Sequence, residues 1–489
     1  MNSQSKNKVL ERLKKRKVGM VFLAIQAILT IVISVLLVML RMLGPLYNTA
    51  IIITLVVLFG LMVMGQCSRG QTHISFKVVI ALFCILLSIG CFYLYKAYVT
   101  ASTATDSKVT DLFQVVVLKD STANSITDVK GEEFGIDTTQ KNEAYNQIKE
   151  KIQKDLGTPI TTKEYVDSIS LVDSLYNKES KVIILNTAVL SNIVEDYPNF
   201  EAETRILNTY ELVTKNENNA KVKSVTEEPF SIFISGIDTY GKISTKSRSD
   251  VNIIVTVNPK TKQIMLTSTP RDYFVQTSVS GSAYDKLTHA GIYGVECSME
   301  TLEKLYGIEI NYYAKVNFSG FKDIINALGS VTVQSDYAFT AQHGEVFREG
   351  ANVVDGKKAL AFVRERHAFP SGDLQRNKNQ QALIKAVIEK VASPAILSGF
   401  TGIMDAVKDS VMTNMSYEEI AALVQMQLNQ GGSWNVTSFG VSGEGGSSTT
   451  YSNQKKAGYV MYIDEAKVAE ASGYIKQVIN GEVPVVNKK

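Results

Sequence analysis

Charged side chains lie at the ends of three short apolar runs in the stretch 230–272. The runs, at residues 231–237, 251–257 and 263–268, are rich in β-branched residues and predict strands. In an α/β sheet, polar groups at strand ends meet in a crevice where ligands bind. Carboxylates beside arginines in such a crevice suit a phosphorylated ligand that carries magnesium. The charged residues at these strand ends are Asp238, Arg248, Asp250, Arg271 and Asp272.

Arginine is concentrated in a few places, whereas lysine is spread along the whole chain. No arginine lies between Arg69 and Arg205, and none follows Arg376. The planar guanidinium group suits two-pronged binding of phosphate or carboxylate, so this concentration favours an anion site. Chance and structural ion pairs are the alternative explanation. The arginines of the downstream region are Arg205, Arg248, Arg271, Arg348, Arg364, Arg366 and Arg376.

Two pairs of charged residues are spaced as side chains on one face of a strand would be. Arg248 and Asp250 form one pair, and Arg364 and Arg366 form the other. If each pair lies in extended chain, its two side chains point to the same side. Each arginine then adds a grip on the same phosphate group. For the second pair, ion pairing with neighbours such as Glu365 on the surface is the alternative.

A helix predicted at residues 374–391 carries further polar groups of this kind. Arg376 and Gln380 are four apart and share one face of that helix, and Asp373 lies near its start. Because magnesium usually takes one or two protein carboxylates, Asp238 and Asp250 are the predicted metal ligands. A β-turn role for Asp238 and an exposed position for Arg376 are the alternatives.

Three apolar stretches near the N-terminus predict a membrane anchor. They lie at 18–40, 46–65 and 78–95, and each is close to the ~20 residues that cross a bilayer as a helix. The tail at 1–17 is rich in lysine and arginine, and the loop at 66–77 is also basic. Basic segments stay on the cytoplasmic side, so we expect the N-terminus there. Three crossings then place the chain after about residue 98 outside the cell.

The extracellular part is expected to fold as two α/β units, because helix and strand patterns alternate along it. Residues 99–228 form an accessory domain and linker that contain no catalytic motif. Residues 229–489 form the second unit, in which the motifs with candidate chemistry lie at 229–395. A segment rich in Gly and Ser at 442–448 predicts a loop in its C-terminal part.

Several other kinds of site are not favoured by the sequence. The formal net charge of +3 indicates no particular partner, and binding of nucleic acid is not expected. Cys297 is the only cysteine beyond the apolar region, so no internal disulfide can stabilise that part. No GxSxG nucleophile motif is present. The histidines, which lack zinc-site spacing, are His73, His289, His343 and His367.

The candidate residues lie in motifs that resemble those of the LytR-CpsA-Psr family. The three apolar stretches and the extra domain before the motifs resemble a capsule-locus subgroup of that family. This chain departs from the family pattern at Asn379, where a second arginine is common. In chain order the motifs are GIDTYG (236–241), SRSDVNIIVTVNPKTKQI (247–264), TPRD (269–272), DKLTHAGIYG (285–294), INALGSVTV (325–333), DGKKALAFVRER (355–366) and DLQRNKNQQ (373–381).

The resemblance implies an α/β/α layered catalytic domain with a mixed central sheet, preceded by three transmembrane helices and a small α/β accessory domain. It implies Mg²⁺ held by Asp238 and Asp250, with Asp250, Arg271 and Asp373 taking part in catalysis. It also implies a pyrophosphate site made by Arg248, Arg271, Arg364, Arg366, Arg376 and Gln380.

The function implied by the resemblance is transfer of a phosphorylated glycan, a capsular polysaccharide, from a polyprenyl-pyrophosphate carrier onto peptidoglycan at the outer membrane face. The polyprenyl tail would need an apolar slot between the sheet and its helices. Two alternatives stay open. A protein that binds polyprenyl phosphate without catalysis would need the arginines but not Asp250. A membrane-anchored regulator of capsule expression that acts through residues 1–17 would need the tail but not Arg271.

Overall fold

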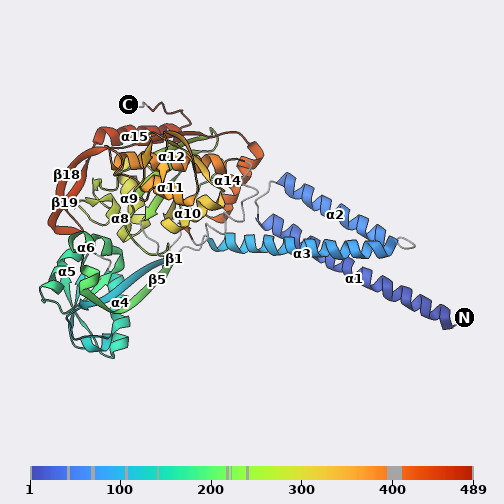
Figure 1. Ribbon diagram of the computed structural model, residues 1–489, viewed down its shortest axis with the longest axis horizontal. Coiled ribbons are helices and arrows are strands. Elements are labelled where there is room, and N and C mark those ends of the chain that lie inside the picture. Colours follow the sequence, from blue (N-terminus) through green and yellow to red (C-terminus); the bar gives the residue numbers. More distant parts are fainter. Residues whose placement is uncertain are drawn as a thin grey trace. The chain divides into compact units, whose positions relative to one another are not determined.

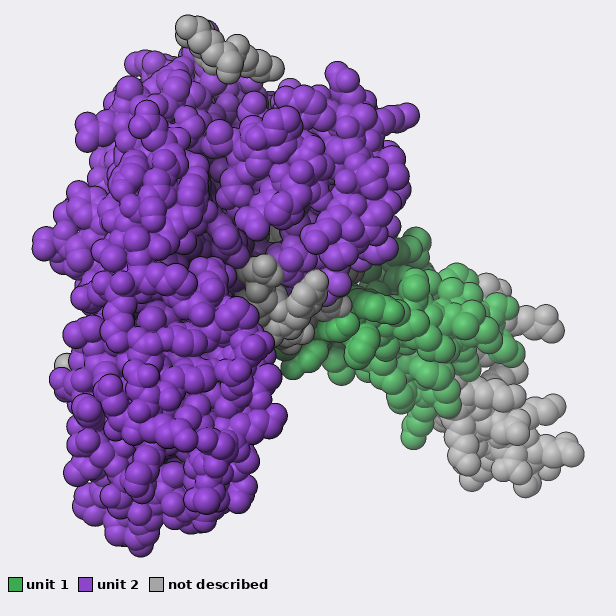
Figure 2. All heavy atoms as spheres, turned by 60° about the vertical axis from the view of Figure 1, so that its left-hand side comes forward, with its two compact units in different colours: residues 1–103, 416–432 green, residues 104–415, 433–489 purple. Residues whose placement is uncertain are grey.

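The computed structural model describes residues 3–40, 45–67, 72–104, 108–139, 142–215, 220–221, 223–237, 242–393 and 410–486. The chain divides into two compact units, coloured separately in Figure 2. Residues 1–103 and 416–432 make the first unit, and residues 104–415 and 433–489 make the second.

Long apolar helices make up most of the first unit: α1 (Ser3–Leu40), α2 (Pro45–Cys67) and α3 (Thr72–Ala104). Each contains a segment of 21 to 24 residues that is long and apolar enough to cross a membrane, which confirms the three predicted spans. The unit also includes α14 (Tyr417–Gln430), which Ser416 and Glu419 cap. The Tyr417 hydroxyl donates to the backbone carbonyl of Leu40 over 2.6 Å.

The second unit begins with a small domain, in which Figure 1 labels β1, β5, α4, α5 and α6. It is built on a five-stranded sheet in the order β3-β2-β4-β1-β5. Helix α4 (Asn142–Leu156) covers one face through its buried isoleucines, and α5 (Ser168–Tyr176) covers the other. The other elements are β1 (Lys108–Leu118), η1 (Ile126–Val129), β2 (Glu133–Asp137), β3 (Thr161–Tyr165), β4 (Val182–Asn186), η2 (Thr187–Val189), α6 (Leu190–Asp196), α7 (Phe200–Glu203) and β5 (Thr204–Lys215).

A six-stranded sheet in the order β16-β11-β6-β7-β8-β17 forms the centre of the larger domain. The pairs β11–β6 and β17–β8 are parallel and the other three are antiparallel, which confirms the expected mixed sheet. The C-terminal part of the chain supplies both edge strands. The strands are β6 (Phe230–Ile237), β7 (Val251–Asn258), β8 (Gln263–Ser268), β11 (Tyr312–Asn317), β16 (Val411–Thr413) and β17 (Asn435–Gly440).

Helices cover both faces of this sheet, because successive residues of its strands point to opposite sides. Phe233 of β6 joins the core under α9 and α15, whereas its neighbours Ile232 and Ile234 face α10 and α12. The result is the layered α/β/α arrangement that the motifs predict. The helices are α8 (Leu287–Tyr293), α9 (Val295–Tyr306), α10 (Phe318–Ala327), α11 (Gly356–Arg364), α12 (Asp373–Val391) and α15 (Glu465–Ile479).

Short hairpins surround the larger domain. Three two-stranded ladders join β9 to β10, β12 to β15 and β13 to β14. Their strands are β9 (Phe274–Val275), β10 (Asp285–Lys286), β12 (Val331–Ser335), β13 (Phe339–Thr340), β14 (Val346–Phe347) and β15 (Gly350–Val354).

The prediction of a loop at 442–448 is wrong from Gly443 onward. This segment belongs to strand β18 (Gly443–Thr450), which pairs antiparallel with β19 (Asn453–Ile463). Tertiary packing overrides the low strand propensity of glycine here. A Cβ added at Gly446 would lie 2.3 Å from the Tyr462 ring, so the small residue makes room for an aromatic side chain of the partner strand.

Candidate active site

A charged cavity of about 440 Å³ lies where β7 begins and β8 ends. These ends meet because the two strands pair antiparallel, from Ile253 opposite Ser268 to Asn258 opposite Gln263. The remaining wall comes from α10, α11, the start of α12 and the β13–β14 turn. The predicted site residues that line this cavity are Asp250, Arg271, Arg364, Arg366, Arg376 and Gln380.

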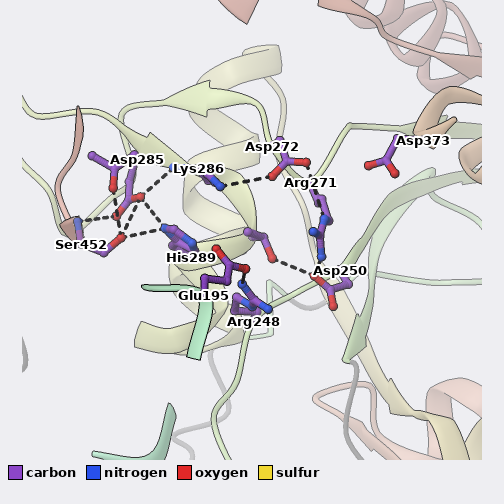
Figure 3. Close-up of polar contacts among 12 residues, drawn as sticks. Glu195, Arg248, Asp250, Arg271, Asp272, Asp285, Lys286, His289, Asp373 and Ser452 are labelled. Atoms are coloured by element: carbon purple, nitrogen blue, oxygen red, sulfur yellow. Dashed lines mark hydrogen bonds and ion pairs between the residues drawn. The ribbon is translucent and has the colours of Figure 1, made fainter. Parts of the chain in front are cut away.

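Asp250 and Arg271, which both line the cavity, form an ion pair (Figure 3). Arg271 Nη1 donates to Asp250 Oδ1 over 2.8 Å, and the Thr288 hydroxyl donates to the same oxygen over 3.1 Å. Burial alone would raise the pKa of the Asp250 carboxyl, but the charges of Arg271, Arg248 and Arg376 outweigh it and hold that pKa below its usual value. Asp250 is therefore a carboxylate at neutral pH.

A second ion pair lies at the start of α12. Arg376 Nη2 donates to Asp373 Oδ2 over 2.9 Å, and Arg366 Nη1 lies 3.8 Å from Asp373 Oδ1. Burial, reinforced by the charges of Arg271 and Arg366, lowers the pKa of Arg376 although Asp373 opposes the change. Arg376 and Gln380 both line the cavity, as expected for residues four apart on one helix face.

Two arginines of the cavity keep a buried donor without a hydrogen bond. Within the described residues, Nε of Arg271, which lies 3.6 Å from Asp272 Oδ2, and Nε of Arg376 are buried and donate no hydrogen bond. Buried donors of this kind are rare because leaving them unpaired costs free energy. The oxygens of an anion such as phosphate are acceptors of the kind that these donors lack.

Arg364 and Arg366 line the cavity together, but not as neighbours on one strand face. Arg364 is the last residue of α11, which Asp355 caps, and Arg366 follows the helix. The condition of extended chain is therefore not met for this pair. The Arg364 guanidinium lies over the Phe318 ring, 4.2 Å from its centre, which fixes its position by a cation–π contact.

Arg248, Asp238 and Asp373 do not share the placement of the other predicted residues, and Asp373 pairs with the cavity residue Arg376 without lining the cavity itself. Arg248 is not among the described residues that line the cavity. Its Nη1 instead donates to Oε1 of Glu195, at the end of α6 in the small domain (Figure 3). Asp238 lies outside the residues that the structure describes.

An apolar cavity of about 370 Å³ adjoins the charged one, between the sheet and helices α10 and α12. Both cavities are lined by Asp250, Val251, Phe318, Leu360, Val363 and Gln380, so they share a wall. The rest of the apolar cavity is lined mainly by aliphatic side chains, among them Ile232, Ile384 and Ile388. The sequence predicted that a slot would be needed here but could not separate its lining from ordinary core.

The described residues fit a magnesium ion only through a small number of protein ligands. They include no group of three or more His, Cys, Asp or Glu side chains arranged to hold a metal. Asp250 is ionised and half of its carboxylate, Oδ2, is not used by Arg271 or Thr288. Magnesium commonly takes one or two carboxylates and completes its shell with phosphate oxygens and water, and Asp250 satisfies that requirement.

Sequence reasoning missed three contributors to the site. Thr288 and Lys286 lie in the motif DKLTHAGIYG, and their position within it was a usable signal. Thr288 bonds Asp250, and Lys286 Nζ lies 3.7 Å from Asp272, which in turn lies 3.6 Å from Arg271. Glu195 carries no motif and was not found, because its contact with Arg248 joins parts of the chain that are distant in sequence.

Comparisons with known proteins agree with the motifs. The model of the LytR_cpsA_psr family matches residues 199–476. A protein of Bacillus anthracis named polyisoprenyl-teichoic acid–peptidoglycan teichoic acid transferase TagU is 34% identical over 250 residues, which cover 50% of this chain and 80% of the relative. The protein of that name from Enterococcus faecalis is 36% identical over 215 residues, which cover 43% and 70%.

A comparison with solved structures also finds similar proteins. The structure of B. subtilis TagV has 28% sequence identity and a TM-score of 0.44, over 53% of this chain and 99% of the other. The family model covers more than half of this chain, and the B. anthracis relative is matched over four fifths of its length. The chain belongs to the LytR-CpsA-Psr family.

Proposed function

We propose that this protein transfers a phosphorylated glycan from a polyprenyl-diphosphate carrier onto peptidoglycan. The relatives' name describes transfer of teichoic acid from a polyisoprenyl carrier to peptidoglycan, which supports this reaction class. The observation that carries the proposal is the pair of adjoining cavities. One is lined by arginines and the other by aliphatic side chains, and they share a wall at Asp250 and Gln380.

The two cavities match the two ends of one amphiphilic donor. A diphosphate needs several charge-assisted hydrogen bonds, which Arg271, Arg364, Arg366 and Arg376 are placed to supply. The transfer of an isoprenoid chain from water to an apolar surface is favourable, and the cavity between the sheet and α12 offers such a surface. A small soluble phosphate ester would use only the first cavity.

In the proposed reaction an acceptor hydroxyl oxygen forms a bond to the phosphorus that carries the glycan. The bond from that phosphorus to the bridging oxygen breaks, and polyprenyl phosphate leaves with that oxygen. The arginines stabilise the charge that develops on the phosphoryl and leaving oxygens, which is the main task of a protein in phosphoryl transfer. The energy is already stored in the diphosphate, so no nucleotide is needed.

The carboxylates of the site have different proposed roles. The lowered pKa of Asp250 makes it a weak proton acceptor and a good ligand for a cation. Asp250 would hold Mg²⁺ on its second oxygen, and the ion would neutralise charge on the diphosphate. Asp373, which approaches the cavity beside Arg376, is then the candidate that accepts the hydroxyl proton.

A capsular polysaccharide is the proposed glycan. The three apolar helices and the extra domain before the family domain support this choice, because that layout resembles the capsule-locus subgroup, CpsA-like proteins. The relatives are named for teichoic acid instead. A direct test presents both lipid-linked polymers as donors to the same preparation and compares kcat/KM, which should be larger for the capsular donor.

The proposed topology places the N-terminus in the cytoplasm and both α/β domains outside the cell. It rests on the basic tail and on three segments able to cross the membrane. Cysteine labelling with a membrane-impermeant reagent would test it. A cysteine introduced at exposed Asp323 should react in intact cells and one introduced at Ser5 should not.

Transfer to peptidoglycan by wild type, Asp250→Ala and Arg271→Ala, with and without magnesium, tests the reaction itself. Both variants should lose most turnover, and Asp323→Ala and Arg348→Ala, which change exposed residues outside the cavity, should keep it. Equal turnover in all five proteins would reject the assignment. A protein that binds lipid without catalysis would bind the donor but show no transfer. A regulator of capsule expression would lose its function only when residues 1–17 are removed.

A further inference from the structure

The ion pairs of the cavity differ in where their acids come from. Asp250 and Asp373, the partners of Arg271, Arg366 and Arg376, belong to the larger domain itself. The partner of Arg248 is Glu195, which lies in the last turn of helix α6 of the small domain. A residue of the small domain therefore holds an arginine that lies two positions before Asp250.

Arg248 lies close to the cavity without being part of its wall. The positive charge of Arg248 is one of those that lower the pKa of Asp250. The guanidinium is therefore within electrostatic reach of the Asp250 carboxylate. It is not among the described residues that line the 440 Å³ cavity. The contact with Glu195 accounts for this position, because it points the guanidinium toward α6 (Figure 3).

The ion pair between Glu195 and Arg248 is weak enough for a stronger anion to displace Glu195. The Glu195 side chain is 50% exposed, and ion pairs with an exposed partner are weak. A diphosphate offers more acceptor oxygens and more negative charge than one carboxylate, and it can accept two parallel hydrogen bonds from a guanidinium. Glu195 and the donor therefore compete for the same arginine.

Helix α6 is fixed in place by the residue next to Glu195. Asp196 Oδ2 accepts from Asn453 Nδ2 over 2.7 Å, and its other oxygen contacts Lys456. Ser452, beside Asn453, is buried, and its backbone N–H donates over 3.0 Å to Asp285 Oδ2 in β10. The end of α6 is thus tied to β19, and through it to the segment that carries Lys286 and Thr288.

We propose that Glu195 is an affinity-determining residue of the donor site, contributed by the small domain. It holds Arg248 outside the cavity, and Arg248 reaches the diphosphate only by leaving Glu195. Donor binding then includes the free energy of breaking this ion pair, so the small domain sets the donor affinity. This inference rests on the proposed function, since it requires that the cavity binds a diphosphate.

The test measures binding of farnesyl diphosphate with Mg²⁺ to the full chain in lipid nanodiscs by titration calorimetry. Glu195→Gln keeps the shape of the side chain and removes its charge, so its Kd should fall about two- to fivefold. Arg248→Ala should raise the Kd. In the Arg248→Ala background, Glu195→Gln should have no further effect, because the two residues act through one contact.

Two readings separate this role from a general effect on folding or charge. Glu201→Gln makes the same charge change at an exposed position on α7 and should leave the Kd unchanged. In the transfer assay Glu195→Gln should lower KM and leave kcat at the wild-type value, which a loosened fold would not do.

Unchanged or weaker binding by Glu195→Gln would overturn the inference, and so would an effect of equal size in the Arg248→Ala background. Both results leave the proposed function intact if wild type binds the probe. Failure of wild type itself to bind farnesyl diphosphate would reject the proposed function and this inference with it.

Discussion

The two adjoining cavities are of similar size and opposite chemistry. The one at the strand ends is lined by four arginines together with Asp250, and the one between sheet and helices is lined mainly by aliphatic side chains. Such a pair is unusual within a single domain core, where apolar space is normally filled. The contrast indicates a ligand with a charged head and an apolar tail, and neither cavity alone would indicate it.

The difference also shows how each cavity is maintained. Ion pairs hold the arginines of the charged cavity in place before any ligand arrives, as between Asp373 and Arg376. The apolar cavity depends on helices α10 and α12 standing off the sheet at residues such as Ile234 and Val387. Substitutions in the first should change chemistry, and substitutions in the second should change which tails are accepted.

The largest expected effect comes from removing a charge at the head-group end. Arg376→Leu should lower kcat/KM for transfer by about 10²–10³-fold, the scale on which loss of a transition-state donor acts. Arg376→Lys should recover only part of the activity, because a lysine cannot offer the planar fork. Steady-state assays with circular dichroism as a folding control would measure this. If Arg376→Leu were about as active as the control Arg348→Ala, the role of the charged cavity in transfer would be contradicted.

The next effect comes from filling the tail end. Ile384→Trp should raise the KM for long-chain donors by about tenfold or more, since each methylene kept from burial costs about 0.8 kcal/mol. Inorganic pyrophosphate should bind as well as it does to wild type, because it needs only the charged cavity. Val353→Trp, at an exposed position on β15, is the matched control. Equal loss for short and long donors would show that the apolar cavity is ordinary core.

Lys315 is a buried basic residue that lines neither cavity, so it can be compared with the arginines of the charged cavity. It is 5% exposed and its Nζ donates to the Thr245 carbonyl over 2.7 Å. Burial, the largest cause, lowers its pKa from 10.5 to about 8. Between these values the unfolded chain carries a proton that the folded chain lacks, so stability should rise with pH by up to about 1.4 kcal/mol per unit.

Denaturation of the full chain in detergent, followed by Trp434 fluorescence between pH 7.5 and 10.5, would measure that slope. Lys315→Met should flatten it, because the titrating group is gone. A wild-type slope that is flat or falling over this range would show that Lys315 stays charged when buried.

The smallest effect is expected at the shared wall. Phe318 lines both cavities and carries the Arg364 guanidinium on its ring. Phe318→Leu should weaken diphosphate binding by about 0.5–1 kcal/mol, the size of an exposed cation–π contact. Phe318→Tyr keeps the ring and should bind as wild type. Calorimetry with inorganic pyrophosphate on both variants would separate this head-group effect from any effect on the tail.

Local pattern was enough to predict the elements that carry the candidate site. The strands at 231–237, 251–257 and 263–268 correspond to β6, β7 and β8, because each is a short apolar run bounded by polar residues. The helix expected at 374–391 is α12, which begins one residue earlier at Asp373. Spacing along α12 also placed Arg376 and Gln380 on one wall.

Contacts between distant segments could not be predicted in the same way. Nothing near Arg248 in the sequence points to Glu195, 53 positions away. The strand β18 was missed because its glycines disfavour a strand locally, while its pairing with β19 and the tyrosines there are tertiary facts. The residues that line the apolar cavity could not be predicted for the same reason. The local sequence around Ile384 would be the same whether this residue packed in a core or lined a binding slot.

Mapping where a photoreactive isoprenoid diphosphate attaches tests the central claim most directly. With a diazirine at the end of its tail, the probe should modify residues of α10 and α12 that line the apolar cavity, such as Phe321 and Val387, and Arg376→Leu should abolish the labelling. Labelling confined to the membrane helices α1–α3, or labelling of α12 that survives Arg376→Leu, would contradict a single ligand held across both cavities.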